Sequence, residues 1–425
     1  MSIAENITRA FKHDNFRKYF FWQFLSFTGT WIQSTAQSWL VYRLTGSPLF
    51  LGLVSFAGSL PSLVLAPLSG VIADRFKRKN ILLTTQILCT LHGIILIALY
   101  FSNVINKWHI FFLSIFLGIA NSFDVTARQT FLPLLVNKGE LLNAIALNSS
   151  MFNAARIVGP AIAGILISQS GEGICFILNL ISYIPFIIFL LLVQAKENDI
   201  KKVSSHFGHL KEGLLFAWKT KPIRYLLILL GTFSFFGMSF TTLMPIFSDQ
   251  ILHKGSKGLG MLMGASGIGA VSGGLFLAAR QKVFGVKKII AISSLLTSIC
   301  LILFSFSRSY ALSLALLMII GFCFIIINSG SNTLMQAVSP NHLRGRIIGL
   351  YSMMFMGLFP LGSLTIGFLA NSFGVTFAVT VGATACFMVA LYFSTKVKML
   401  AKETKELVCK EENESRTACH CEEGL

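Results

Sequence analysis

Charged residues are scarce in this chain, and acidic residues are the scarcest of them. Only 12% of the 425 residues are charged, with 17 Asp and Glu against 35 Lys and Arg, whereas 54% are hydrophobic. A soluble protein carries about 25% charged residues, so this composition excludes a large soluble protein. Runs of apolar residues recur from end to end, and each is long enough to cross the roughly 30 Å hydrocarbon core of a bilayer.

Several chemical signatures are also missing from the sequence. It has no phosphate-binding loop, no Ser/His/Asp constellation and no cluster of metal ligands within the apolar runs. We therefore expect no enzyme, no ATP-driven pump in this single chain, no cofactor and no metal. The eight cysteines form no disulfide framework, because five lie in or beside apolar runs, where cysteine acts as a small hydrophobe. Residues 1–18 are polar and basic and show no signal-peptide cleavage site.

The apolar runs predict an all-α membrane protein with 12 transmembrane helices. A backbone in hydrocarbon must satisfy its hydrogen bonds internally, which a helix does. The expected spans are 18–43, 49–73, 80–101, 109–130, 143–168, 174–194, 223–247, 258–280, 286–306, 309–333, 345–370 and 374–394.

The longest polar interruption, residues 195–222, divides these spans into six and six. The expected parts are an N-terminal six-helix bundle (1–194), a cytoplasmic linker (195–222), a C-terminal six-helix bundle (223–394) and a disordered cytoplasmic tail (395–425). Within the linker, one face of an amphipathic helix recurs at helical spacing, so we expect a helix on the membrane surface. That face consists of Phe207, Leu210, Leu214, Leu215 and Trp218.

The net charge of +18 comes from cations gathered on one side of the membrane. On the other side fall only Arg43, Lys107, Lys254, Lys257 and Arg308, and a single cation lies within a span. Positive residues favour the cytoplasmic side, so both termini are expected there. The same distribution excludes nucleic acid as the partner and favours contact with anionic lipid.

The two halves repeat one another weakly. Pro133 and Pro340 follow corresponding spans, and Pro160 and Pro360 lie inside the next ones. A parallel repeat of this kind predicts two six-helix bundles related by an axis along the membrane normal.

A tight turn between the second and third spans reads Gly70-Val-Ile-Ala-Asp74-Arg75-Phe76-Lys77-Arg78-Lys79. Asp74 is positioned to accept from Arg75, Arg78 or the end of a neighbouring helix. We expect Gly70, Asp74, Arg75 and Arg78 to form a conformational latch between the bundles.

Few charges lie within the spans, and an intramembrane charge is usually functional or paired. Asp124 and Arg128 are four residues apart and share a helix face. One interpretation joins them with Arg156 in a cluster for substrate binding or proton coupling, in which Asp124 titrates. The other interpretation is a fixed Asp124–Arg156 pair between helices. Asp249 is interpreted as a solvated charge at a span end.

Polar side chains in the first span recur at helical spacing and predict a cavity lining. These candidates are Gln23, Ser26, Thr30, Gln33 and Gln37, with Asn148 and Asn328 added from later spans. In the fifth span, Gly159 and Gly164 allow close helix packing, and Pro160 can bend the helix.

A series of motifs occurs in the order typical of one family. These are Leu44-Thr45-Gly46-Ser47-Pro48, the Gly70–Lys79 turn, Asp124-Val-Thr-Ala-Arg128-Gln129, Leu142–Ser149, Arg156–Gly164 and Leu343-Arg344-Gly345-Arg346. Together they resemble the branch of the major facilitator superfamily that contains the enterobactin exporter and macrolide efflux pumps. One departure is Thr126, where the family usually has proline.

The resemblance implies proton-driven export of a siderophore or hydrophobic drug across the bacterial inner membrane. Because Arg128 and Arg156 outnumber Asp124, we prefer a carboxylate-rich siderophore as cargo. The alternatives are a multidrug or macrolide pump, a lysophospholipid transporter, and, in a different class, a transporter-like sensor or assembly factor. We expect a small-molecule substrate, protons and the lipid bilayer as partners, a monomer, and leave open an outer-membrane export partner.

Overall fold

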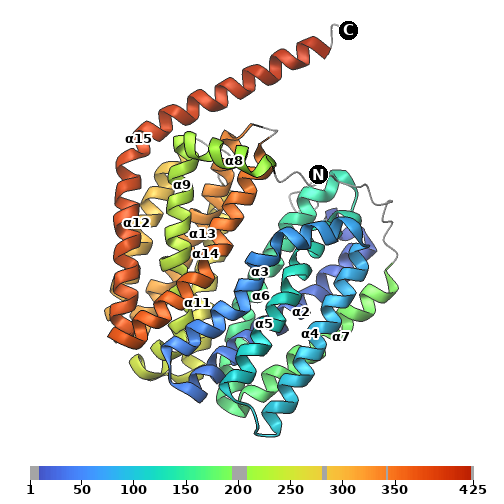
Figure 1. The fold of residues 1–425 in the computed structure, drawn as a ribbon, viewed down its shortest axis with the longest axis vertical. Coiled ribbons are helices and arrows are strands. Elements are labelled where there is room, and N and C mark those ends of the chain that lie inside the picture. Colours follow the sequence, from blue (N-terminus) through green and yellow to red (C-terminus); the bar gives the residue numbers. More distant parts are fainter. Residues whose placement is uncertain (1–8, 194–207, 280–284, 341–342, 423–425) are drawn as a thin grey trace.

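The computed structural model describes residues 9–193, 208–279, 285–340 and 343–422, and these residues are almost entirely helical. Two groups of long helices lie side by side, and both chain termini lie at the same end of the molecule (Figure 1). We call this the terminal end, and the other the opposite end.

The N-terminal half contains six long helices. They are α2 (Asp14–Thr45), α3 (Pro48–Arg75), α4 (Arg78–Phe101), α5 (Lys107–Phe131), α6 (Leu141–Ser170) and α7 (Glu172–Leu192), with short 3₁₀ turns at Arg9–Lys12, Leu132–Leu134 and Lys138–Glu140. The connections are short because the sequence supplies sharp stops and starts. Gly46 ends α2 with φ 58°, and Ser47 then accepts from the Phe50 amide to begin α3.

The C-terminal half follows α8 (Gly208–Lys219) and again contains six long helical segments. Its first crossing is a composite of α9 (Lys221–Thr232), η4 (Phe233–Met238), η5 (Ser239–Leu243), α10 (Met244–Ile246) and η6 (Phe247–Ile251). The others are α11 (Gly255–Ala278), α12 (Val286–Phe306), α13 (Tyr310–Val338), α14 (Arg344–Phe373) and α15 (Val375–Glu422). The wide turns of η4 and η6 make this crossing the least regular of the described helices.

Eleven helices among the described residues are long and apolar enough to cross a membrane. The exception is α2, whose 32 residues suffice in length but include many polar side chains. It packs between α6 and α7 inside the N-terminal half. Its crossing, the twelfth, therefore stays a prediction, whereas the all-α membrane fold is confirmed.

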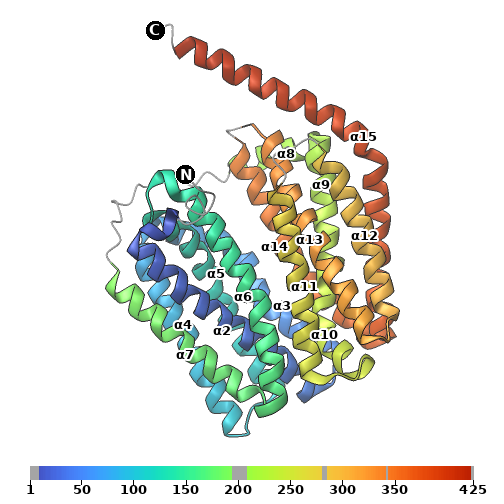
Figure 2. The ribbon, with the colours of Figure 1, turned by 180° about the vertical axis from the view of Figure 1, so that it is seen from behind.

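Helix α8 lies across the terminal end of the C-terminal half (Figures 1 and 2). Gly213 and Ala217 face the protein, and the Gly213 position meets the side chain of Arg346. Leu214, Leu215 and Trp218 of the predicted apolar face are 53%, 50% and 65% exposed. This orientation leaves the apolar face toward the surroundings, as a membrane-surface helix requires. Phe207 and the Leu210 side chain lie outside what the structure describes.

The predicted disordered tail is wrong for most of its length, because α15 continues to Glu422 (Figure 1). The polar segment beyond the expected span end at 394 has no glycine or proline before Gly424 and is rich in Lys and Glu. These residues lose little side-chain freedom in a helix, so the helix has no local reason to stop.

Glycine pairs join the two halves toward the opposite end. A Cβ atom on Gly164 of α6 would lie 2.9 Å from the Gly260 Cα atom of α11, and one on Gly367 of α14 would lie 3.0 Å from the Gly52 Cα atom of α3. Toward the terminal end the ribbons of the halves diverge (Figures 1 and 2). The backbones of the two halves therefore approach closely at positions where glycine permits it.

We predict that Gly269→Ala destabilises the protein, because the new methyl group would overlap the Met318 carbonyl oxygen where α11 packs on α13. Overpacking of this kind costs about 1–3 kcal/mol. Gly274→Ala is the matched control, since nothing lies within 4 Å of a Cβ atom at that position. Thermal unfolding of the purified variants in detergent tests this, and equal Tm values for the two variants would contradict the close approach.

Candidate functional site

A central cavity of about 430 Å³ lies between the two halves. Its lining comes from α2, α3, α5 and α6 on one side and from the composite crossing, α11 and α14 on the other. The N-terminal half supplies mainly polar side chains, namely Thr30, Gln33, Ser34, Thr35, Gln37, Ser38, Ser55, Ser59, Ser114 and Asn121. The C-terminal half supplies mainly apolar ones, namely Met238, Met244, Pro245, Leu259, Met263 and Phe359.

Arg156 is the one charged side chain in this lining. It projects from the middle of α6, and its guanidinium carbon lies 5.8 Å from the centre of the Trp31 ring. Within the described part of the chain no carboxylate pairs with it. A cation without a counter-ion in a membrane cavity attracts an anionic group, and Trp31 gives it a cation–π neighbour.

The polar wall is held in place by hydrogen bonds inside the N-terminal half. Gln37 donates to the Ser114 hydroxyl over 2.8 Å, and Asn179 donates to Gln33 over 2.7 Å. The structure thus brings Thr30, Gln33 and Gln37 to the cavity as the sequence predicts.

The other cavity candidates do not line it. Gln23 and Ser26 are buried within the N-terminal half, and the Gln23 amide has no partner among the described residues. Asn148 has a buried, unbonded Oδ1 atom in α6, and Asn328 accepts from Tyr351 inside the C-terminal half. Helical periodicity predicts that Gln23 and Ser26 share the polar face of the first span with Thr30, Gln33 and Gln37. The part of that face formed by Gln23 and Ser26 points into the N-terminal bundle instead of the cavity.

Asp124 and Arg128 come together, and Arg156 does not join them. Asp124 accepts from Arg128, from the Thr85 hydroxyl over 2.8 Å and from the Gln86 amide over 2.9 Å. Both members of the pair are nearly fully buried inside the N-terminal half, away from the cavity lining. The expected Asp124–Arg156 contact is therefore wrong, because the i,i+4 partner on the same helix satisfies Asp124 first.

Aromatic rings complete the surroundings of Arg128. Its guanidinium carbon lies 4.6 Å from the centre of the Phe186 ring and 5.1 Å from that of Phe27. The pair thus connects α5 to α4 through hydrogen bonds and to α2 and α7 through ring contacts. These contacts hold the four helices together.

The small residues of α6 act at two different contacts. A Cβ atom on Gly159 would lie 3.1 Å from the Thr28 carbonyl oxygen, so this glycine serves packing on α2 within one half. Gly164 instead meets α11 across the halves, and the Pro160 carbonyl lies at the same contact beside Gly260. Pro160 is accommodated inside a continuous α6.

In the turn predicted as a latch, Asp74 is turned toward the surroundings. Asp74 and Arg75 are exposed, and nothing lies within 4 Å of a Cβ atom on Gly70. Asp74 accepts from no group among the described residues, contrary to the expected contact. Nearby, Lys79 donates to the Leu191 and Val193 carbonyls over 3.1 and 2.9 Å, which binds this turn to the end of α7.

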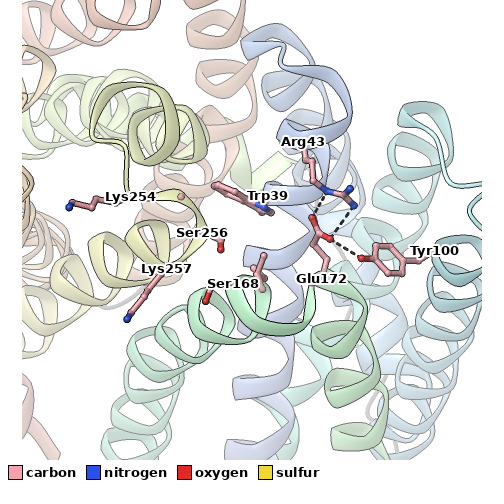
Figure 3. Close-up of a pocket in the computed structure, with 11 residues that line it drawn as sticks. Trp39, Arg43, Tyr100, Ser168, Glu172, Lys254, Ser256 and Lys257 are labelled. Atoms are coloured by element: carbon pink, nitrogen blue, oxygen red, sulfur yellow. Dashed lines mark hydrogen bonds and ion pairs between the residues drawn. The ribbon is translucent and has the colours of Figure 1, made fainter.

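A second pocket, of about 510 Å³, lies at the opposite end and includes residues from both halves (Figure 3). Arg43 binds Glu172 through Nε over 2.8 Å and Nη2 over 3.1 Å, and Tyr100 donates to the same carboxylate over 2.9 Å. Lys254 and Lys257 line the far side of the pocket and point away from this cluster (Figure 3). The cluster therefore fixes the ends of α2, α4 and α7.

Asp249, interpreted above as a solvated charge, joins the halves instead. The Tyr42 hydroxyl of α2 donates to its carboxylate over 2.6 Å. Sequence reasoning missed this contact because no spacing relates residues 207 positions apart, although both lie at predicted span ends on the same side.

Solved structures of membrane transporters share this fold. A POT family transporter in complex with 5-aminolevulinic acid aligns with a TM-score of 0.72 at 12% identity, over 91% of this chain and 96% of that one. A bacterial homologue of the iron transporter ferroportin, in an inward-facing state, aligns with a TM-score of 0.67 at 14% identity, over 94% and 100%. At these identities the likenesses show a shared fold.

The chain belongs to the transmembrane secretion effector family of the major facilitator superfamily, whose sequence profile matches residues 8–421, and it is therefore a membrane transporter. Curated relatives include the staphyloferrin A transporter of Staphylococcus aureus, 27% identical over 91% of this chain and 98% of the relative. The multidrug efflux pump Tap of Mycolicibacterium fortuitum is 27% identical over 82% and 87%. Macrolide efflux protein A of Streptococcus pyogenes is 24% identical over 82% and 87%.

We predict that Asp124→Asn strongly destabilises the protein, because it leaves the buried Arg128 charge uncompensated. Breaking one partner of a buried pair costs about 3–5 kcal/mol. The double variant Asp124→Asn, Arg128→Gln should recover part of the loss, and thermal unfolding of all three proteins measures it.

The control for this comparison is Asp14→Asn, which removes an exposed pair with Arg17 at 2.7 Å. Its effect should stay below about 1 kcal/mol. A normally stable Asp124→Asn protein that fails only in transport would favour the titrating role over the packing role.

Proposed function

We propose that this transporter exports a small anionic amphiphile, a carboxylate-bearing siderophore, from the cytoplasm. The observation that carries the proposal is Arg156, the single charged side chain in the central cavity, which has no carboxylate partner among the described residues. A carboxylate bound there would supply the missing counter-charge.

The two walls of the cavity support an amphiphilic cargo. Hydroxyl and amide groups on the N-terminal half offer hydrogen bonds, and methionine and phenylalanine on the other half offer adaptable apolar contacts. The relative named as a staphyloferrin A transporter matches nearly its whole length to this chain, which adds weight to a siderophore.

A multidrug or macrolide pump is the second candidate. It is favoured by the apolar wall of Met238, Met263 and Phe359, because methionine-rich surfaces tolerate varied ligands. Tap and macrolide efflux protein A, at similar coverage, are relatives of this kind. The two candidates differ in whether the Arg156 charge is required.

The proposed orientation puts the terminal end in the cytoplasm of a bacterial cell, because most of the Lys and Arg residues fall on that side. The glycine contacts and the Tyr42–Asp249 bond close the end that faces outward. In the proposed cycle these contacts part after cargo binds, and the exposed Asp74 turn closes on the other half.

Export against a gradient requires an energy source, and the sequence has no phosphate-binding loop. We therefore keep proton antiport in the proposal. A coupling role for Asp124 would require its bonds to Arg128, Thr85 and Gln86 to rearrange, so the first test concerns cargo rather than the proton site.

The test compares secretion by cells that lack the gene with cells complemented by wild type, Arg156→Gln or Arg156→Lys, in iron-poor medium. Loss of one charge-assisted hydrogen bond costs about 1.5–3 kcal/mol, or roughly tenfold or more in affinity. We expect Arg156→Gln to leave an iron-chelating metabolite inside the cells, and Arg156→Lys to restore part of its secretion. Mass spectrometry of medium and cells measures both pools.

Secretion that is equal in wild type and Arg156→Gln would contradict an anionic cargo. If the deletion strain releases the same amount of iron-chelating metabolite into the medium and is more sensitive to a macrolide, the cargo is a drug and not a siderophore. Equal membrane levels of the variants, checked by immunoblot, are required for either reading.

We predict that Tyr42→Phe weakens closure of the opposite end, because it removes the hydrogen bond to Asp249. The Ser47 Oγ and Asn371 Oδ1 atoms lie 3.4 Å apart across the two halves. Spin labels at these two positions report the distance between the halves at the opposite end by pulsed electron paramagnetic resonance. In Tyr42→Phe, the population with a long label-to-label distance should grow by about tenfold over wild type, because a hydrogen bond to a charged group is lost. Tyr225→Phe, which breaks a contact within one half, is the control; identical distance distributions for both would contradict the closing role.

A further inference from the structure

A lateral groove of about 390 Å³ runs along the C-terminal half, separate from both pockets described above. Its walls are α9 with η4 on one side and α14 on the other, and α8 covers its terminal end. The walls come from Leu227, Ile228, Gly231 and Phe235 facing Met354 and Leu358. It shares no lining residue with the central cavity.

The groove faces away from the packed interior of its own half. On α9, Leu226, Leu229 and Leu230 are buried in the core, whereas Ile228 on the groove side is 43% exposed. In Figure 1, α9 and α14 lie side by side below α8. Helix α9 lies on the side of α14 that faces away from the N-terminal half. In a membrane-spanning protein this surface meets hydrocarbon, so an apolar chain is the chemistry that fits it.

The terminal end of the groove is cationic and aromatic. Arg224 lines it from the first turn of α9, and its guanidinium carbon lies 5.7 Å from the centre of the Trp218 ring and 5.5 Å from that of Tyr225. The Arg224 guanidinium donates to the Trp218 carbonyl over 3.4 Å. The neighbouring Lys221 is neutralised by Glu403 over 2.9 Å, whereas Arg224 has no carboxylate partner there.

These features together match the two ends of one lipid molecule. Tryptophan and tyrosine mark the depth of the headgroups, and cationic sites between membrane helices bind anionic headgroups. The start of a helix adds the positive end of its dipole near Arg224. A hydrophobic groove that continues from such a site into the bilayer accommodates an acyl chain.

We propose that this groove binds an anionic phospholipid of the surrounding bilayer, with its phosphate at Arg224 and one acyl chain between α9 and α14. The lipid also contacts Trp218, so it fills the space between α8 and α14. Since α14 packs on α3 of the other half, the bound lipid supports a helix that belongs to the contact between the halves.

The test uses the full-length protein, purified in mild detergent and stripped of lipid. Phosphatidylglycerol or phosphatidylcholine with identical acyl chains is added, and native mass spectrometry counts the lipids retained. We expect wild type to retain phosphatidylglycerol with about tenfold preference, the value of one charge-assisted contact. Arg224→Gln should remove the preference, whereas Lys288→Gln, an exposed cation at the start of α12, should keep it.

Gly231→Leu tests the acyl-chain part separately. A Cβ atom there would lie 3.0 Å from Leu358 Cδ1 and 3.4 Å from Met354 Sδ, so a larger side chain fills the groove. We expect it to lower retention of both lipids without changing the relative preference of the remainder. If this variant does not purify as a folded protein, Ile228→Trp fills the groove from an exposed position.

Three outcomes would overturn the proposal. They are the absence of a phosphatidylglycerol preference in wild type, its persistence in Arg224→Gln, and unchanged retention in the groove-filling variant. A wild-type dimer that Gly231→Leu converts to monomer, without lipid preference, would assign the groove to a second copy of the chain instead.

Discussion

Burying a charge within a membrane costs several kcal/mol unless something compensates it, and this constraint organises the whole structure. Asp124 and Arg128 neutralise each other inside one half, and Arg43 and Glu172 do so at the opposite end. Asp249 accepts from Tyr42 of the other half. Arg156 is the one charge in the cavity lining and has no carboxylate partner among the described residues, which is why we propose it as the position that receives a ligand.

The difference between the two halves follows from this division of roles. The N-terminal half holds the polar wall, with side chains fixed by bonds such as Gln37 to Ser114. The C-terminal half contributes methionines and Phe359, which impose no fixed hydrogen-bond pattern on a cargo. In the proposed function, one half would orient a polar group of the cargo, and the other half would accept variation in its apolar part.

The fold was largely predictable, because a long apolar run in hydrocarbon satisfies its backbone hydrogen bonds within the segment by forming a helix. Helical periodicity pointed to Thr30, Gln33 and Gln37 as cavity-lining residues, and all three line the central cavity. It failed where partners depend on how helices rotate against each other, as for Asp124 with Arg156 and for Gln23. The helical extension of α15 was missed because a polar composition was equated with disorder, although helix propensity was high.

Contacts across the halves were beyond sequence reasoning for a related reason. Gly164 was expected to face a neighbour, but nothing in a single sequence shows that the neighbour is Gly260, almost a hundred residues away and in the other half. The same holds for Gly52 with Gly367. Long-range pairing is a property of the assembled bundles, and local patterns report only which residues are small enough to take part.

The seam made by these glycines has a kinetic consequence. Most helix interfaces interlock through side chains, and parting them requires each side chain to leave its rotamer and its hole. At Gly164 and Gly260 the surfaces are bare backbone, so there is little to disengage. In the proposed cycle, separation there would give up backbone dispersion contacts without requiring a side chain to change its rotamer.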